Sequence, residues 1–129
     1  MDMQEITLNL VDNKSLAGRE DKYDTIDVNL KAVLESWKIS LFSFEWLNPD
    51  GSIRSENQLP EGEAEKYNNV LNDLKNGKAL ERPVLGIGIM DNVEIGSRRD
   101  VLLTLMTQGI ENLSVHVPKS NVKDFAPYL

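Results

Sequence analysis

Between residues 83 and 118, apolar runs alternate with turn residues in one definite order: strand, tight turn, strand, helix, strand. The expected elements are strands at 84–89 and 93–95, a helix at about 98–108 and a strand at 113–117, bounded by Pro83, Asp91-Asn92, Gly96, Gly109 and Pro118. The first two strands form a hairpin. This part of the chain therefore predicts a sheet with a helix packed on it.

The residues before this segment carry weaker signals of the same kinds. Alternation, periods of three and four residues, and turns rich in glycine or proline set the expected boundaries. The expectations are a strand at 5–11, a polar loop at 12–24, a helix at 26–37 capped by Thr25, a strand at 38–47, a turn at 48–51 and a helix at 61–76 stopped by Gly77.

These elements place the chain in the α+β class, as a small mixed sheet with helices packed on it. Its 129 residues fit a single domain, 1–129. Within that domain we expect a strand-helix-hairpin-helix-strand core at 38–118. An N-terminal strand-helix extension at 1–37 precedes the core, and a C-terminal tail at 119–129 follows it.

Charge narrows the classes of function. The formal net charge is −7, whereas a general nucleic-acid binder needs a basic surface, because phosphate contacts dominate its affinity. A nucleic-acid partner is therefore not expected; a small molecule or a protein, including a basic one, is. The chain has no cysteine, which excludes a disulfide framework, a thiolate metal site and a cysteine nucleophile.

The first residues, Met1-Asp2-Met3-Gln4-Glu5, are acidic where a signal peptide would be basic and then apolar. The longest apolar stretch, at about 101–106, is too short to cross a bilayer. The sequence therefore predicts a cytoplasmic protein with no membrane partner.

Gly96 and Ser97 begin the turn between the hairpin and the next helix. A glycine at this point lets the chain reverse where a Cβ would clash. Ser97, followed three residues later by Asp100 and an apolar run, matches a helix capping box in its Asp form. Capping accounts for Ser97 and Asp100 without any further function.

Arg98 and Arg99 fall in the first turn of the expected helix, where the positive end of the helix dipole disfavours each cation by about 0.3–1 kcal/mol. A bound anion would remove this conflict, because free N–H groups and two guanidinium groups form a receptor for phosphate or carboxylate. Alternatively, both arginines pair with neighbours among the 21 acidic residues. The sequence alone leaves both interpretations open.

The hairpin, the Gly-Ser-Arg-Arg turn at 96–99, the apolar helix and the last strand together resemble the ParB/sulfiredoxin (ParB N-terminal domain-like) superfamily. In that superfamily the elements follow one another in the order helix, strand, hairpin, Gly-x-(His/Arg)-Arg turn, helix and strand. The resemblance covers about 38–118 and is sharpest over 83–118. Asn48-Pro49 followed by Arg54 is similar to the Asn-Pro-x-x-x-Arg loop of ParB proteins, with one residue more.

In that superfamily the turn binds nucleotide phosphates, those of CTP in ParB clamps and of ATP in sulfiredoxin. The resemblance implies a nucleoside triphosphate assisted by Mg²⁺, cradled by Gly96, Ser97, Arg98 and Arg99. Ser97 stands where sulfiredoxin has its reactive cysteine, which excludes sulfinic-acid reduction by that route. Val101 stands where ParB has a third arginine, so one phosphate contact is missing and a partitioning clamp is not expected.

Three other groups of residues have candidate chemistry. Asp91, Glu94 and Asp100 flank the turn and could hold Mg²⁺ beside a phosphate, although turn and capping roles explain two of them. His116 titrates in a range suited to catalysis, but strand alternation places it away from the apolar side of its strand, in a surface or half-buried position. The aromatic residues of 37–46 could stack on bases, although the core is their expected place; they are Trp37, Phe42, Phe44 and Trp46.

The preferred function is binding of a nucleotide or another small anion at the turn, with hydrolysis of a nucleoside triphosphate as an open question. No catalytic residue and no dedicated metal site is assigned. The alternative is a non-catalytic protein-binding or inhibitor module, of the plasmid- or phage-borne interference type, that keeps the fold without the chemistry. A nuclease is a third interpretation, and it needs DNA contact despite the acidic charge.

Overall fold

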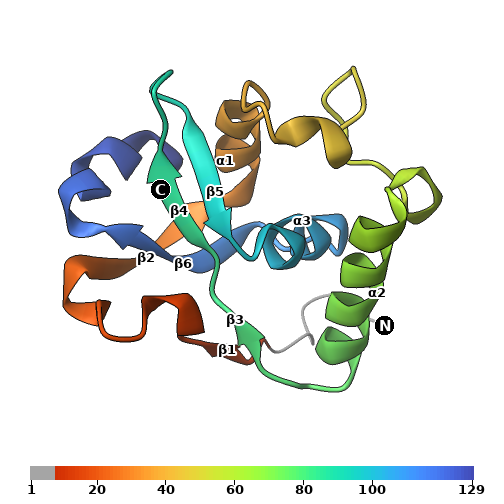
Figure 1. Ribbon diagram of the computed structural model, residues 1–129, viewed down its shortest axis with the longest axis horizontal. Coiled ribbons are helices and arrows are strands. Elements are labelled where there is room, and N and C mark those ends of the chain that lie inside the picture. The colour runs from red at the N-terminus through yellow and green to blue at the C-terminus, as the bar shows by residue number, and fades with distance from the viewer. Residues whose placement is uncertain (1–7) are drawn as a thin grey trace.

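The computed structural model describes residues 8–129, and a four-stranded mixed sheet lies at its centre (Figure 1). Its strands are β2 (Tyr23–Asn29), β4 (Val84–Ile87), β5 (Val93–Ser97) and β6 (Asn112–Pro118), in the order β2-β6-β4-β5. Strand β6 pairs antiparallel with β2 and parallel with β4, and β4 and β5 form the hairpin. A separate two-stranded parallel sheet joins β1 (Leu10–Val11) to β3 (Leu80–Glu81). The predicted α+β class is confirmed.

Three α-helices and a C-terminal segment pack around this sheet. The helices are α1 (Leu30–Trp37), α2 (Glu61–Lys75) and α3 (Arg99–Thr107). Helix α1 contacts β2 and β5, whereas α2 packs along α3. The C-terminal segment, Lys119–Tyr128, is a run of 3-10 turns that contacts β2, β4, β6 and α1. Figure 1 shows α2 at one end of the molecule and this blue segment at the other.

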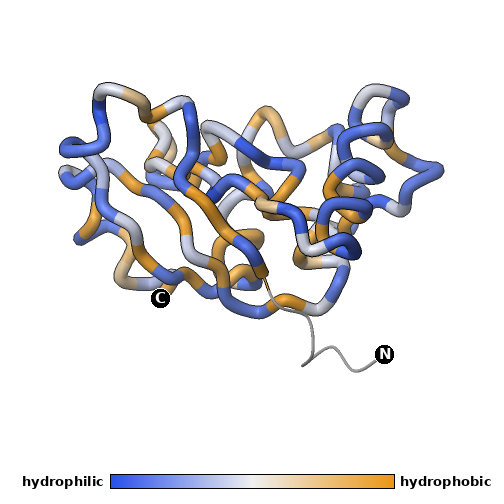
Figure 2. Tube along the Cα trace, turned by 90° about the horizontal axis from the view of Figure 1, so that it is seen from below, coloured by the Kyte–Doolittle hydropathy of each residue, from blue (hydrophilic) through white to orange (hydrophobic). Residues whose placement is uncertain are grey.

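A single apolar core joins the sheet, the helices and the C-terminal segment. Its fully buried members are Val28, Leu30, Val33, Trp37, Trp46, Val93, Val101, Leu102, Leu103, Leu105, Val115, Val117 and Phe125. Hydrophobic residues recur along the strands in Figure 2, whereas much of α2, at the right, is hydrophilic. None of the helices in residues 8–129 has the length and apolar content needed to cross a bilayer.

The helix predicted at 26–37 begins later in the structure, at Leu30. Residues before Leu30 form β2, which pairs with β6 along its whole length. The capping acceptor is the side chain of Asn29 rather than that of Thr25, and it receives the N–H of Ala32 at 2.9 Å. Alternating apolar residues and β-branched side chains favour a strand in this stretch. The helical part from Leu30 onward is confirmed.

The strand predicted at 38–47 is wrong, because serine side chains turn the chain locally. The Ser43 hydroxyl donates to the carbonyl oxygens of Lys38 and Ser40, at 3.0 and 2.9 Å. A 3-10 turn follows at Ser43–Glu45. Hydrogen bonds from a hydroxyl group to the nearby backbone compete with the hydrogen bonds that would pair this stretch into a sheet. A composition rich in aromatic residues does not by itself make the segment a strand.

The other predicted helices, strands and turn are confirmed in type, whereas the loop predicted at 12–24 ends at Lys22, because Tyr23 and Asp24 belong to β2. The hairpin, α3 and β6 occupy the predicted stretch from 83 to 118, and α2 ends before Gly77. Gly77 and Gly109 adopt positive φ angles of 67° and 86°, as expected for residues that end helices. Of the strand predicted at 5–11, Leu10 and Val11 form β1, and residues 5–7 lie outside the described part of the chain.

Candidate functional site

The turn between β5 and α3 is built differently from the predicted capping box. Strand β5 continues through Gly96 to Ser97, and the chain reverses at Arg98, which has φ 58° and ψ 44°. Arg98 is the N-cap residue and makes no side-chain capping bond. A Cβ on Gly96 would meet only the Val84 carbonyl oxygen, at 3.5 Å, so glycine is not sterically required there. The capping box and the role given to Gly96 are therefore both wrong.

Ser97 serves the strand rather than the helix. Its hydroxyl accepts a hydrogen bond from Asn13 Nδ2 at 3.0 Å, and the same Nδ2 donates to the carbonyl oxygen of Arg82 at 2.9 Å. Asn13 is buried, and its Oδ1 accepts from the N–H of Ser15 at 2.9 Å. Sequence reasoning missed Asn13, because nothing local marks a loop asparagine as the link between Arg82, which precedes β4, and the end of β5.

Arg98 is neutralised by carboxylates, as one of the two sequence interpretations proposed. It binds Asp100 through Nε and Nη2, both at 3.1 Å, and Glu81 through Nη1 at 2.9 Å. Burial opposes the arginine's charge, but Asp100 and Glu81 outweigh it and raise the pKa of Arg98. The Lys14 N–H, together with Arg98, lowers the pKa of Glu81. This guanidinium group is occupied.

Arg99 is held by aromatic rings instead. Its guanidinium carbon lies 5.5 Å from the ring centroid of Trp37 and 5.6 Å from that of Phe42. Within residues 8–129 it forms no ion pair, and its buried Nε has no hydrogen-bond partner. Cation–π contacts of this kind hold an arginine in place without cancelling its charge. Both arginines of the motif are therefore cationic, but Arg98 is paired with carboxylates and Arg99 is not.

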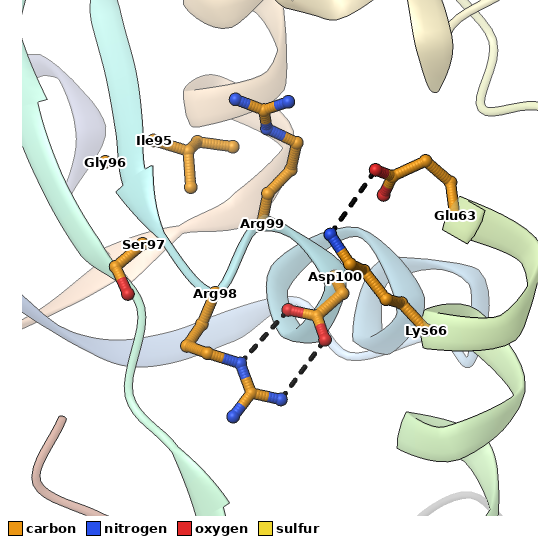
Figure 3. A pocket seen from close by; sticks show the side chains of 8 residues that line it. All are labelled: Glu63, Lys66, Ile95, Gly96, Ser97, Arg98, Arg99 and Asp100. Atoms are coloured by element: carbon orange, nitrogen blue, oxygen red, sulfur yellow. Dashed lines mark hydrogen bonds and ion pairs between the residues drawn. The ribbon is translucent and has the colours of Figure 1, made fainter. Parts of the chain in front are cut away.

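A cleft of about 380 Å³ opens beside this turn. It is lined by Glu63, Lys66, Ile95, Gly96, Ser97, Arg98, Arg99 and Asp100 (Figure 3). Figure 3 shows Arg98 and Arg99 pointing to opposite sides of the start of α3, while Glu63 and Lys66 reach toward it from α2. Lys66 Nζ lies 3.5 Å from Glu63 Oε1, a long and exposed ion pair worth little energy.

All four residues predicted for the site, 96–99, line this cleft. Glu63 and Lys66 were missed, because the packing of α2 along α3 cannot be inferred from either helix alone. The N–H groups of Arg99 and Asp100, which open α3, lack acceptors within the helix, whereas that of Val101 donates to the Arg98 carbonyl oxygen at 3.1 Å. A left-handed residue followed by a helical one, as at Arg98 and Arg99, creates a concave arrangement of N–H groups that suits an anion.

The acidic residues considered for Mg²⁺ do not converge. Asp100 binds Arg98, and Glu94 accepts from Ser40 Oγ at 2.6 Å and from Asn92 Nδ2 at 3.0 Å. Asp91 forms the hairpin turn with φ 58°. Among residues 8–129, no group of three or more His, Asp or Glu side chains is placed to hold a metal ion.

His116 is buried, whereas the prediction was a surface or half-buried position. Its Nε2 accepts from the N–H of Asn13 at 3.2 Å, and its Nδ1 lies 3.1 Å from Thr25 Oγ1. The neutral ring with its proton on Nδ1 satisfies both contacts. Residues 12–16 cover this face of β6, which is why alternation alone misplaced the ring. His116 holds the N-terminal loop against the sheet and lies outside the cleft.

This histidine gives a pH prediction. Burial lowers the pKa of His116 from its usual 6.5, against a smaller opposing effect of Asp12. The unfolded chain therefore binds a proton more readily, and stability falls as the pH drops through 6.5 toward the lower folded pKa. The slope is at most about 1.4 kcal/mol per pH unit. Urea unfolding at pH 7.5 and pH 5.5 measures this loss; His116→Gln should flatten the dependence, and an unchanged slope in that variant would contradict it.

The aromatic residues of 37–46 divide into two groups. Trp37 and Trp46 are fully buried, as the core interpretation predicted, and Trp46 Nε1 donates to Glu63 at 3.1 Å. Phe42 and Phe44 are exposed, so the core interpretation is wrong for them.

Comparison of the chain with models of known protein families, with curated proteins and with solved structures finds no match. The ParB/sulfiredoxin resemblance therefore stays a prediction from the sequence.

Proposed function

We propose that the protein binds the phosphate group of a nucleotide or another small anion at the β5–α3 turn, with Arg99 as the charged contact. The observation that carries this proposal is the unpaired guanidinium of Arg99 at the cleft. The lining contains three cations, of which Arg98 faces two carboxylates and Lys66 faces one. Arg99 has no carboxylate partner in the described part of the chain.

Backbone geometry supports the same ligand class. The positive end of α3 and the N–H groups around Arg98 and Arg99 favour negative charge in the cleft. Arg98 adopts a left-handed backbone, which costs a non-glycine residue free energy, and such strain concentrates at binding sites. The cleft volume also falls within the range of small-molecule sites. Contact with the negative charge of the ligand therefore falls to Arg99 rather than to both arginines of the motif.

The test is calorimetric titration with inorganic phosphate, pyrophosphate, ATP and CTP, each with and without Mg²⁺. We expect saturable binding that weakens at least 10-fold in Arg99→Met, because methionine keeps an apolar side chain over the rings and removes the charge. Arg19→Met is the matched control: Arg19 also stacks on an aromatic ring, Tyr23, at 5.8 Å, but does not line the cleft. That variant should bind as wild type does.

A second variant tests the electrostatics in the opposite direction. Asp100→Asn removes the carboxylate that binds Arg98 through two nitrogens, which frees part of that guanidinium and makes the cleft more positive. Affinity for the anion should rise several-fold. No binding at millimolar ligand, or equal affinity of wild type and Arg99→Met, would refute the proposal. Release of phosphate from ATP or CTP by the same preparation tests whether hydrolysis accompanies binding.

A further inference from the structure

A second surface feature lies on loops that do not line the cleft. Five large apolar side chains gather there, from the loop at 39–42 and the tip of the β4–β5 hairpin. They are Ile39, Leu41, Phe42, Ile89 and Met90, with relative exposures of 57%, 86%, 57%, 102% and 70%. Together with Ser40, Asn92 and Glu94 they line a groove of about 350 Å³. We call these five residues the apolar surface.

The groove is fixed by hydrogen bonds rather than formed by a loose loop. Ser40 Oγ donates to Glu94 Oε1 at 2.6 Å, which ties the loop to the hairpin, and accepts from the N–H of Phe42 at 3.1 Å. Asn92 Nδ2 donates to the other oxygen of Glu94 at 3.0 Å. A Cβ on Gly88 would come within 3.0 Å of Glu94 Cγ, so the hairpin backbone also packs closely here. A preformed groove reduces the ordering cost of binding.

Exposed apolar groups gathered in one place mark interaction sites, whereas single ones are ordinary. Other exposed large apolar residues of the described chain, such as Val11 and Leu129, do not line this groove. Phe42 also stacks on Arg99, so one of its faces is already occupied by a cation.

Charge indicates what kind of partner covers the surface. Glu94 lines the groove, and Asp91 lies beside Met90 at the exposed hairpin tip. Neither carboxylate forms an ion pair within residues 8–129. The chain as a whole carries −7. A second copy would place these like charges against each other, whereas a cationic segment would be attracted to them.

We propose that the apolar surface docks a segment of another protein that carries large apolar side chains flanked by lysine or arginine. The apolar side chains enter the groove between Leu41 and Ile89, and the cations pair with Asp91 and Glu94. This groove shares no lining residue with the anion cleft, although Phe42 contacts Arg99, and its proposed role goes beyond the function proposed above. Its test avoids Phe42 and Arg99, so that failure of one proposal leaves the other standing.

The test selects peptides from a random displayed library against the wild-type protein, with counter-selection against Leu41→Ser/Ile89→Ser. Both positions are exposed, so this variant should fold, which circular dichroism verifies. We expect enriched peptides with several large apolar residues and a net positive charge. A synthetic representative, followed by fluorescence anisotropy, should bind the double variant at least 10-fold more weakly and Asp91→Lys several-fold more weakly. Leu129→Ser, an exposed apolar residue elsewhere, is the control and should bind normally.

Three results would overturn this proposal. The first is enrichment of neutral or acidic peptides, and the second is failure to enrich any peptide that depends on Leu41 and Ile89. The third is a dimer, detected by light scattering at micromolar concentration, that Leu41→Ser/Ile89→Ser dissociates. That result would assign the surface to a second copy of this chain.

Discussion

Replacing Phe125 with alanine is expected to lower the free energy of unfolding by about 3–5 kcal/mol. Phe125 is fully buried, and its ring packs edge-on against Tyr128 with centroids 5.8 Å apart. The Tyr128 hydroxyl donates to Ser36 Oγ at 3.2 Å, which links the C-terminal segment to α1. Removing the ring leaves a cavity where the segment meets the core, and the loss is a large part of the 5–15 kcal/mol typical of a domain.

Urea unfolding followed by tryptophan fluorescence measures this effect. Lys123→Ala is the control, because Lys123 lies in the same segment and is exposed. Its stability should stay within about 0.5 kcal/mol of wild type. Equal stability of the two variants would mean that the segment contributes little to the core.

Asn13→Ala is expected to cost about 2–4 kcal/mol, an effect unusual for a loop residue. Its buried side chain forms three hydrogen bonds, to Ser15, Arg82 and Ser97. Each is worth about 0.5–1.5 kcal/mol net, and the groups left behind lose their partner. The loop that Asn13 anchors also carries the N–H that binds His116.

The matched control is Asn9→Ala. Asn9 is exposed and makes one long hydrogen bond, from Nδ2 to the carbonyl oxygen of Gly77 at 3.4 Å. Its loss should cost well under 1 kcal/mol in the same unfolding assay. A result in which both asparagines cost the same would show that the burial of Asn13 contributes nothing.

The hairpin, α2 and α3 could be predicted because their signals are local: an apolar period, a turn and a terminating glycine. Residues 26–29 could not, because Ile26 and Val28 fit a strand as well as a helix, and pairing with the distant β6 decides between the two. The strand predicted at 38–47 was wrong for another reason. Side-chain bonds of Ser43 to the backbone turned a stretch whose composition favours a strand.

A cleft lies at the turn that the sequence analysis singled out, but the contacts of its two arginines differ from each other. Residues 96–99 all line the cleft, as expected from the pattern of strand, turn and helix. The different states of Arg98 and Arg99 could not be predicted, because they depend on a single left-handed residue and on the rotamers that follow from it. Arg98 contacts Glu81, which lies on β3, and Arg99 contacts Trp37, which lies on α1.

The position of β6 has a consequence for how the protein folds. It is the last strand in the sequence, yet it lies between β2 and β4, and Tyr23 pairs with Pro118. During synthesis β2 therefore has no partner strand until β6, near the end of the described residues, has been made. Pairings this distant in sequence slow folding and lengthen exposure of strand edges. The hairpin and α2 can form early, but closure of the sheet is the late step.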